Sequence, residues 1–243
     1  MGSKKNPTLW LKQNPNNENP VIIPRKSSGA EAHNMLSKKD LNAIQKDLSQ
    51  FDRARERVLD LSRAATRMAS SSILEIHRGD LKTANSTLEQ AEKTLQEIEK
   101  LSADAPELRS SNGVIVAFQE YVEAVTLRKV ARDEGIVSLA ESGADHRSYV
   151  LGLLDAVGEF RRMALNSLRK GDVGKAEKLL DAMEGVYDDL QTLEHTSIVP
   201  TFRVKMDAAR RIIETTRGDV VTEVRRFSLE QALDRLGKKI EDH

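Results

Sequence analysis

Apolar residues recur at intervals of three and four along most of the chain, which is the spacing of amphipathic α-helices. The first such run covers residues 39–78 and ends at Gly79, a typical helix stop. A second run covers residues 80–101, and a helical segment follows Pro106 as far as about residue 135. Further runs cover residues 146–170, 174–193 and 201–227. The pattern predicts an all-α protein.

Two of these predicted helices carry carboxylates on sides where carboxylates are costly. Glu120 and Glu123 are three residues apart and fall on the apolar side of their helix, beside Val116 and Leu127. The opposite face is expected to hold Gln119, Thr126, Lys129 and Asp133.

The predicted helix over residues 146–170 is apolar around most of its circumference, which is typical of a buried helix. One polar seam interrupts it, at alternating spacings of four and three: Ser148, Gly152, Asp155, Glu159, Arg162 and Asn166. Together with Glu120 and Glu123, the acids of this seam give four carboxylates that point inward.

Inward-facing carboxylates require a counter-charge, because an uncompensated buried carboxylate costs several kcal/mol. The pattern leaves open two sources of positive charge, and also the alternative that one of the two helices faces solvent. Hard oxygen ligands favour Mg²⁺, Mn²⁺ or Ca²⁺, whereas Arg162 and other basic groups could satisfy the acids as buried salt bridges. A ferritin-like di-iron site is excluded, since the chain contains no Glu-x-x-His sequence.

Three ordered motifs in this region resemble the translin/Trax family. They are QEYVEA at residues 119–124, SYVLGLLDAVGEFRR at 148–162 and NSLRKGD at 166–172. The resemblance extends over residues 40–227 and is closer to Trax-type members, among them an archaeal Trax-like protein, than to translin. It implies a single-domain antiparallel bundle of about six to seven helices. It also implies that Glu120, Glu123, Asp155 and Glu159 are the metal-binding catalytic acids, which translin itself lacks.

Composition adds limits on location and organisation. The net charge is zero, so binding to nucleic acid would need a local basic face. The chain has no cysteine and no apolar run long enough for a membrane span or signal peptide, which makes a cytoplasmic protein without membrane partners the expectation. We expect a proline-rich flexible tail at residues 1–38 that contains Trp10, a helical domain at 39–228 and a charged tail at 229–243.

A basic face on the first long helix is the candidate RNA-binding surface. It lies opposite the apolar stripe and carries Arg53, Arg57, Arg67 and Arg78, to which Arg162 is added as a nucleic-acid-binding candidate. The planar guanidinium suits phosphate contacts, although internal ion pairs on a solvated helix would explain the same pattern. His77 projects toward the apolar flank and is expected to be a hydrogen-bonded core histidine.

The expected function is that of a Mg²⁺-dependent endoribonuclease, with Mn²⁺ as the alternative metal. The resemblance implies cleavage of single-stranded RNA to 5′-phosphate and 3′-hydroxyl ends, by an inward-facing site within a shell-like homo-oligomer such as an octamer, or with a translin-type partner. DNA is a further candidate ligand. The alternatives are a non-catalytic, translin-like RNA- or DNA-binding protein and a purely structural helical oligomer.

Overall fold

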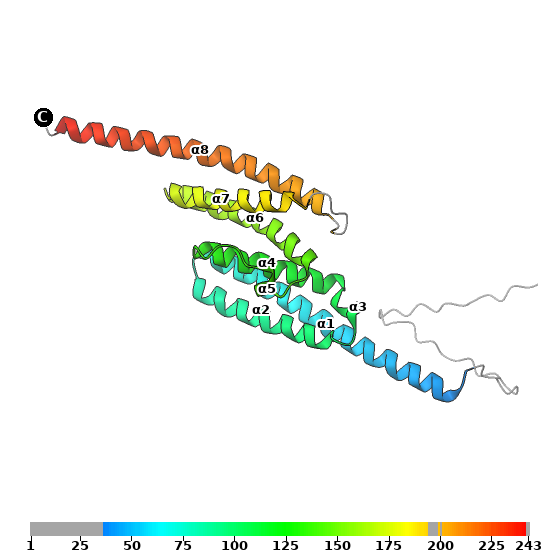
Figure 1. The fold of residues 1–243 in the computed structure, drawn as a ribbon. Helices are drawn as coiled ribbons and strands as arrows, with labels where there is room; N and C mark the ends of the chain where they lie inside the picture. Colours follow the sequence, from blue (N-terminus) through cyan, green and yellow to red (C-terminus); the bar gives the residue numbers. More distant parts are fainter. Residues whose placement is uncertain (1–35, 194–198, 200, 242–243) are drawn as a thin grey trace, which may run out of the picture. The chain divides into compact units, whose positions relative to one another are not determined.

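The computed structural model describes residues 36–193, 199 and 201–241, apart from the side chains of Lys239 and Glu241. Every regular element in these ranges is a helix (Figure 1). Six helices are long and two consist of a single turn. They are α1 (Lys38–Arg78), α2 (Leu81–Leu101), α3 (Pro106–Arg109), α4 (Asn112–Ala131), α5 (Leu139–Ser142), α6 (His146–Arg169), α7 (Val173–Gln191) and α8 (Phe202–Glu241). The predicted all-α fold is therefore confirmed.

The chain divides into two compact units, residues 1–45 and 46–243. In the first unit the described residues are 36 and 37, which precede α1, and 38–45, which form its start. The predicted N-terminal tail and Trp10 lie almost entirely outside the described residues. The predicted final helix ends at residue 227, whereas α8 continues to Glu241, so the expected charged C-terminal tail is helical over its described part. None of the described helices is long and apolar enough to cross a lipid bilayer.

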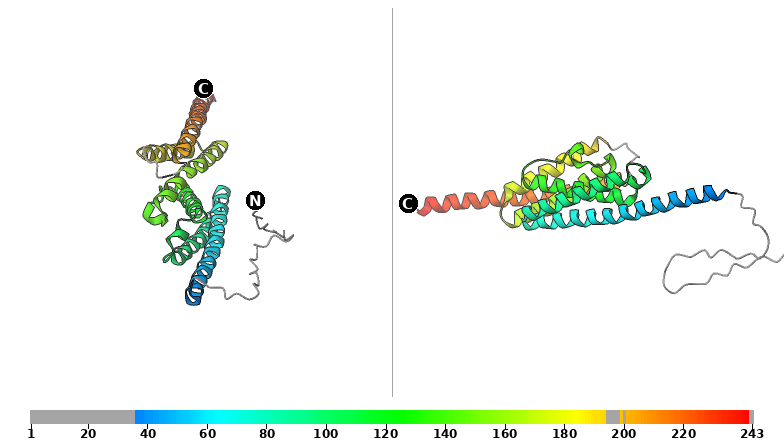
Figure 2. Two further views of the ribbon diagram at one scale, coloured as in Figure 1. Left: turned by 90° about the vertical axis from the view of Figure 1, so that its right-hand side faces the viewer. Right: turned by 90° about the horizontal axis from the view of Figure 1, so that it is seen from below.

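Two helices, α4 and α6, form the centre of the second unit (Figures 1 and 2). α4 contacts α2 and α6, and α6 in turn contacts α7 and α8. The core that they share includes the fully buried side chains of Val122, Leu127, Val157 and Phe160. Burial of these apolar side chains is the main favourable term in folding such a bundle.

Local signals in the sequence fix where several helices begin and end. Asp80, Asp145 and Asp172 accept hydrogen bonds from backbone N–H groups in the first turns of α2, α6 and α7. Gly79 follows α1 with a φ of 85°, a left-handed conformation that glycine adopts without steric cost.

The predicted polar face of α4 is wrong. Thr126 is fully buried, Gln119 is half-buried against α6, and Asp133 lies beyond the end of the helix. Since α4 has neighbours on several sides, its polar residues on that face point at other helices instead of water. A helical wheel gives the relative direction of side chains, but not how many sides of the helix are covered.

Candidate active site

The polar seam of α6 lies against α4 because its residues permit a close approach. An added Cβ at Gly152 would be 2.5 Å from the backbone oxygen of Gln119 and 2.8 Å from Cβ of Val122. Ser148 is also buried, and its hydroxyl donates to the backbone oxygen of Ile115 at 3.2 Å. This contact holds the acids of α6, Asp155 and Glu159, opposite those of α4.

Glu123 occupies the least solvated position of the four acids. Its residue is 9% exposed, and its carboxyl group makes no hydrogen bond or ion pair to any described residue. Burial is the largest cause that raises the pKa of Glu123 to about 8, and the nearby carboxylates of Asp155, Glu120 and Glu159 contribute to the same rise. The structure therefore places the other three predicted acids close enough to Glu123 to disfavour its ionised form.

Asp155 is paired with two side chains from different helices. Its Oδ1 forms an ion pair with Nζ of Lys205 on α8, and its Oδ2 accepts a hydrogen bond of 2.5 Å from Nε2 of Gln119 on α4. The ammonium group of Lys205 also lowers the pKa of Glu123 against the larger effect of burial. A positive charge from the protein thus lies beside the acids.

Glu159 and Glu120 are contacted by α1. Nε2 of His77 lies 2.5 Å from Oε2 of Glu159, and Arg162 approaches the same oxygen at 3.6 Å. The bond to His77 holds the pKa of Glu159 below its ordinary value, with desolvation acting in the opposite direction. Ser70 donates a hydrogen bond of 3.0 Å to Oε2 of Glu120.

The geometry bears on both explanations for the inward-facing acids, buried salt bridges and a bound cation. Asp155 and Glu159 have the basic partners that a salt-bridge explanation requires, while Glu123 has none among the described residues. No group of three or more acidic or histidine side chains in the described ranges is arranged to hold a metal ion. The residue types nonetheless suit a hard cation, since three further carboxylates lie near the unpaired and largely buried Glu123 and carboxylate oxygens are the ligands that such cations prefer.

Four residues of this cluster were not predicted from the sequence: Ser70, Gln119, Lys205 and, in its actual role, His77. His77 is a buried, hydrogen-bonded histidine as expected, but its partner is a candidate catalytic acid. Gln119 belongs to the QEYVEA motif, which was the available signal for it. Ser70 and Lys205 carry no motif, and only the packing of α1 and α8 against the centre reveals them.

The predicted arginines fall into two groups. Arg57 is paired with Glu97 of α2 at 2.8 Å, Arg162 with Glu159, and Arg53 donates to the backbone oxygen of Ser49. Arg67 and Arg78 are exposed and form no ion pair with any described residue. Of the predicted basic face, these two guanidinium groups are the ones free for an external anion.

Comparison with known proteins identifies the family to which this helical bundle belongs. A profile of the translin family matches residues 53–215. The chain belongs to the translin family. Among similar proteins, the uncharacterized protein MJ0175 of Methanocaldococcus jannaschii is 31% identical over 198 residues, which are 81% of this chain and 88% of that protein. Translin-associated protein X of Rattus norvegicus is 25% identical over 181 residues, 58% of this chain and 62% of the rat protein.

A solved structure of AfC3PO in complex with duplex RNA is also similar to this translin-family chain. The identity is 30%, the TM-score is 0.70, and the match covers 76% of this chain and 96% of that one. The resemblance to an archaeal protein and to Trax agrees with the family expected from the three motifs. Both the family and the helical fold are therefore confirmed.

Proposed function

We propose that this translin-family chain is a metal-dependent endoribonuclease that cleaves single-stranded RNA at the cluster of Glu120, Glu123, Asp155 and Glu159. The observation that carries the proposal is Glu123, a buried carboxyl with no partner among the described residues and three other acids around it. A group held in this way is unfavourable for stability, and perturbed acids of this kind concentrate at functional sites.

The four carboxylates would hold the cation, Mg²⁺ or Mn²⁺, which when bound supplies an activated water and offsets negative charge on the phosphate. Glu123 must lose its proton to act as a ligand at neutral pH, given a pKa of about 8. Gln119 and Lys205 restrain Asp155, and His77 restrains Glu159. The ammonium of Lys205 lies beside Asp155, where it would offset the charge of an RNA phosphate held at the acids.

The RNA part of the proposal is supported by the RNA-bound structure of AfC3PO, whose chain is similar over nearly its whole length. In the present chain, Arg67 and Arg78 provide charges that are not neutralised by described residues. Such groups bind the sugar–phosphate backbone without reading the bases, so they would position the strand for cutting. We further propose that copies of the chain assemble into a homo-oligomer, as the resemblance implies.

A second candidate is a translin-like protein that binds RNA or DNA without cutting it. The observation in its favour is that Asp155 and Glu159 already have basic partners, so that the cluster is partly compensated without a cation. The two candidates differ in one outcome, which is whether the RNA chain is broken.

The test is incubation of end-labelled single-stranded RNA with purified protein in Mg²⁺, in Mn²⁺ and with chelator. We expect cleavage only with metal, products with 5′-phosphate and 3′-hydroxyl ends, and loss of cleavage in Glu123→Gln. The matched control is Glu89→Gln, which removes the same charge from an exposed position on α2. Cleavage by Glu123→Gln at the wild-type rate would exclude the four-acid site, and RNA binding without cleavage by the wild type would favour the second candidate.

A further inference from the structure

The polar side of α6 continues beyond the acid cluster into a cavity. After Glu159 the same side carries Asn166 and Lys170, and both line a cavity of about 230 Å³. His77, which contacts Glu159, lines this cavity as well, together with Lys175 of α7. One histidine therefore borders both the acid cluster and the space next to it.

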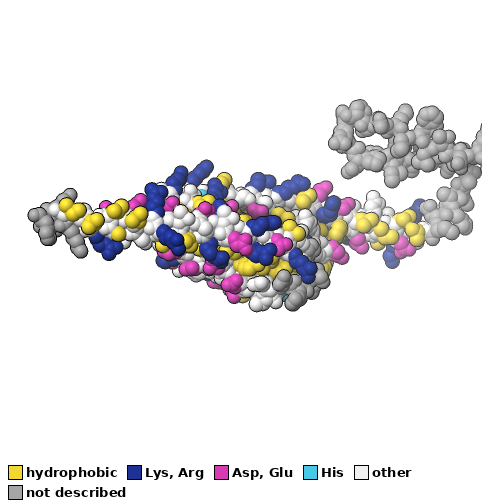
Figure 3. Space-filling model, turned by 90° about the horizontal axis from the view of Figure 1, so that it is seen from above, with side chains coloured by type: hydrophobic (Ala, Val, Ile, Leu, Met, Phe, Trp, Pro, Cys, Tyr) yellow, Lys and Arg dark blue, Asp and Glu magenta, His cyan; other side chains and the backbone are white. Residues whose placement is uncertain are grey.

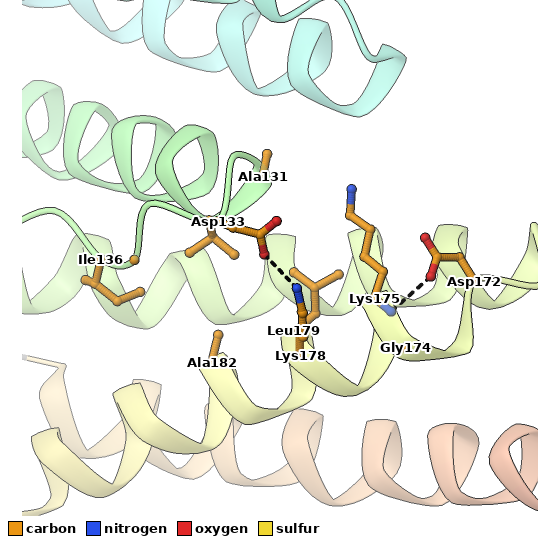
Figure 4. A pocket seen from close by; sticks show the side chains of 11 residues that line it. Ala131, Asp133, Ile136, Asp172, Gly174, Lys175, Lys178, Leu179 and Ala182 are labelled. Atoms are coloured by element: carbon orange, nitrogen blue, oxygen red, sulfur yellow. Dashed lines mark hydrogen bonds and ion pairs between the residues drawn. The ribbon is translucent and has the colours of Figure 1, made fainter.

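A larger cavity of about 560 Å³ follows on the other side of Lys175. The two cavities share Ala131, Asp172 and Lys175 as lining residues, so they are neighbours, and together they are called the groove below. Figure 4 shows that the larger cavity lies between the turn after α4 and the first turns of α7. Its lining includes the apolar side chains of Ile136, Leu179 and Ala182.

The charged groups along this groove are unequal in their pairing. Lys178 forms an ion pair of 3.2 Å with Asp133 at the larger cavity, and Asp172 accepts a hydrogen bond from the backbone of Lys175 as the cap of α7 (Figure 4). The ammonium groups of Lys170 and Lys175 form no ion pair with any described residue. Two lysines without an ion-pair partner among the described residues thus line the smaller cavity, which His77 links to Glu159.

We propose that this groove binds the nucleotide next to the cleaved bond. The order of features along it matches a nucleotide, because Lys170 and Lys175 suit a phosphate, while the partly exposed side chains of Ile136 and Ala182 suit the flat face of a base. The location of the cleaved bond at the acid cluster rests on the proposed function. The proposal gives a binding role to Lys170, Lys175 and Ala182, none of which contacts the four acids or belongs to the basic face of α1.

The phosphate half is tested by Lys170→Gln combined with Lys175→Gln. The control pair, Lys93→Gln with Lys100→Gln, removes the same charge from exposed positions on α2 that line neither cavity. Binding of fluorescent single-stranded oligouridylate is measured by anisotropy in chelator, so that no cleavage occurs. We expect the groove pair to lose about tenfold or more in affinity, as for the removal of charge-assisted hydrogen bonds. Equal affinities of the two pairs would overturn the proposal.

The base half is tested by Ala182→Trp, which fills the larger cavity from a half-buried position. The expected result is weaker binding of oligouridylate with unchanged binding of an abasic ribose–phosphate oligomer of the same length. Thermal unfolding of the variant is recorded alongside, because a misfolded protein would lose both ligands. If both oligomers bind as they do to the wild type, the apolar half of the groove does not hold a base.

A side chain from a second copy of this chain is the competing occupant. Light scattering of both groove variants distinguishes it, since a groove filled by a neighbouring subunit would give a smaller assembly when altered. A reduced mass would overturn the nucleotide subsite. Wild-type protein that binds oligouridylate but cuts no RNA would instead remove the proposed nuclease activity, while the anisotropy comparison would still decide the groove.

Discussion

Glu123 shows how a single buried carboxyl links stability to pH. Its pKa is about 8 in the folded chain against an ordinary value of 4.5, so folded protein holds this proton more tightly than unfolded protein does. Between these two values unfolding releases the proton, and a rise in pH therefore favours unfolding. The contribution of the protonated Glu123 to the free energy of unfolding is complete below pH 4.5 and is lost as the pH passes about 8.

The corresponding prediction concerns Glu123→Gln in metal-free protein. At pH 9 the variant should unfold at a higher temperature than the wild type, because it avoids an uncompensated charge that costs on the order of a few kcal/mol. Near pH 4.5 the two proteins should agree. Melting curves in chelator across this range measure the difference. A constant difference in melting temperature at every pH would contradict the assignment to Glu123. Glu159, whose pKa is lowered, would change the melting temperature only at acidic pH.

At the scale of elements, the contact between α4 and α6 determines whether the acids meet. Gly152 is the residue that permits it, since an added Cβ would collide with the backbone of Gln119. Gly158 lies on the same helix with nothing within 4 Å of its added Cβ. Two glycines in one helix therefore have different roles.

Gly152→Ala should destabilise the protein by about 1–3 kcal/mol through overpacking. Gly158→Ala should instead stabilise it by about 0.5–1 kcal/mol, because alanine loses less backbone entropy in a helix. Urea unfolding followed by circular dichroism measures both. The explanation fails if the two substitutions shift the midpoint in the same direction and by the same amount.

The helices themselves could be predicted from the sequence, and the site only in part. Periodicity located α1 and α2 to within one residue, because each carries one apolar stripe, buried in α1 from Val58 onward, and α1 ends at a recognisable signal, Gly79. The four acids were found because charges on apolar faces stand out. Lys205 and Ser70 were not found, since their contacts depend on long-range packing that no local pattern encodes.

The test of the basic face of α1 is restricted to Arg67 and Arg78, because Arg57 already pairs with Glu97. Arg67→Gln with Arg78→Gln should weaken RNA binding similarly for every sequence. The slope of log affinity against log salt concentration should become shallower by roughly 0.7 for each phosphate that the variant no longer neutralises. Arg211→Gln with Arg225→Gln, also exposed, is the matched control on α8. Anisotropy titrations at several salt concentrations measure the slopes. Identical slopes for the two pairs would mean that Arg67 and Arg78 do not bind the RNA backbone.

For the whole molecule, the exposed apolar residues of α8 are the strongest indication of assembly. Leu229, Leu233, Leu236 and Ile240 are each more than half exposed, at the spacings of a helix–helix seam. Figure 3 shows apolar side chains at the surface on the C-terminal part of α8, whereas Lys and Arg lie interspersed with Asp and Glu elsewhere on that face. Soluble monomers rarely expose such a row.

Leu233→Gln with Leu236→Gln should therefore reduce the mass of the assembly measured by light scattering, since glutamine removes apolar area at the seam. Ala232→Gln, a substitution beside the seam, should leave the mass unchanged. Circular dichroism would verify that α8 remains helical in both proteins. An unchanged mass of the double variant would mean that this part of α8 lies outside the subunit contacts.

The retained proton of Glu123 also reduces the net negative charge of the acid cluster before any cation binds. At neutral pH the folded chain keeps this carboxyl mostly uncharged, with a pKa of about 8, while Lys205 and His77 lie against two of its neighbours. A divalent cation entering the cluster would exchange for about one proton, so the local charge would rise by about one unit instead of two. The apparent affinity for the cation would then increase with alkalinity, and the heat of binding would depend on the buffer that takes up the proton.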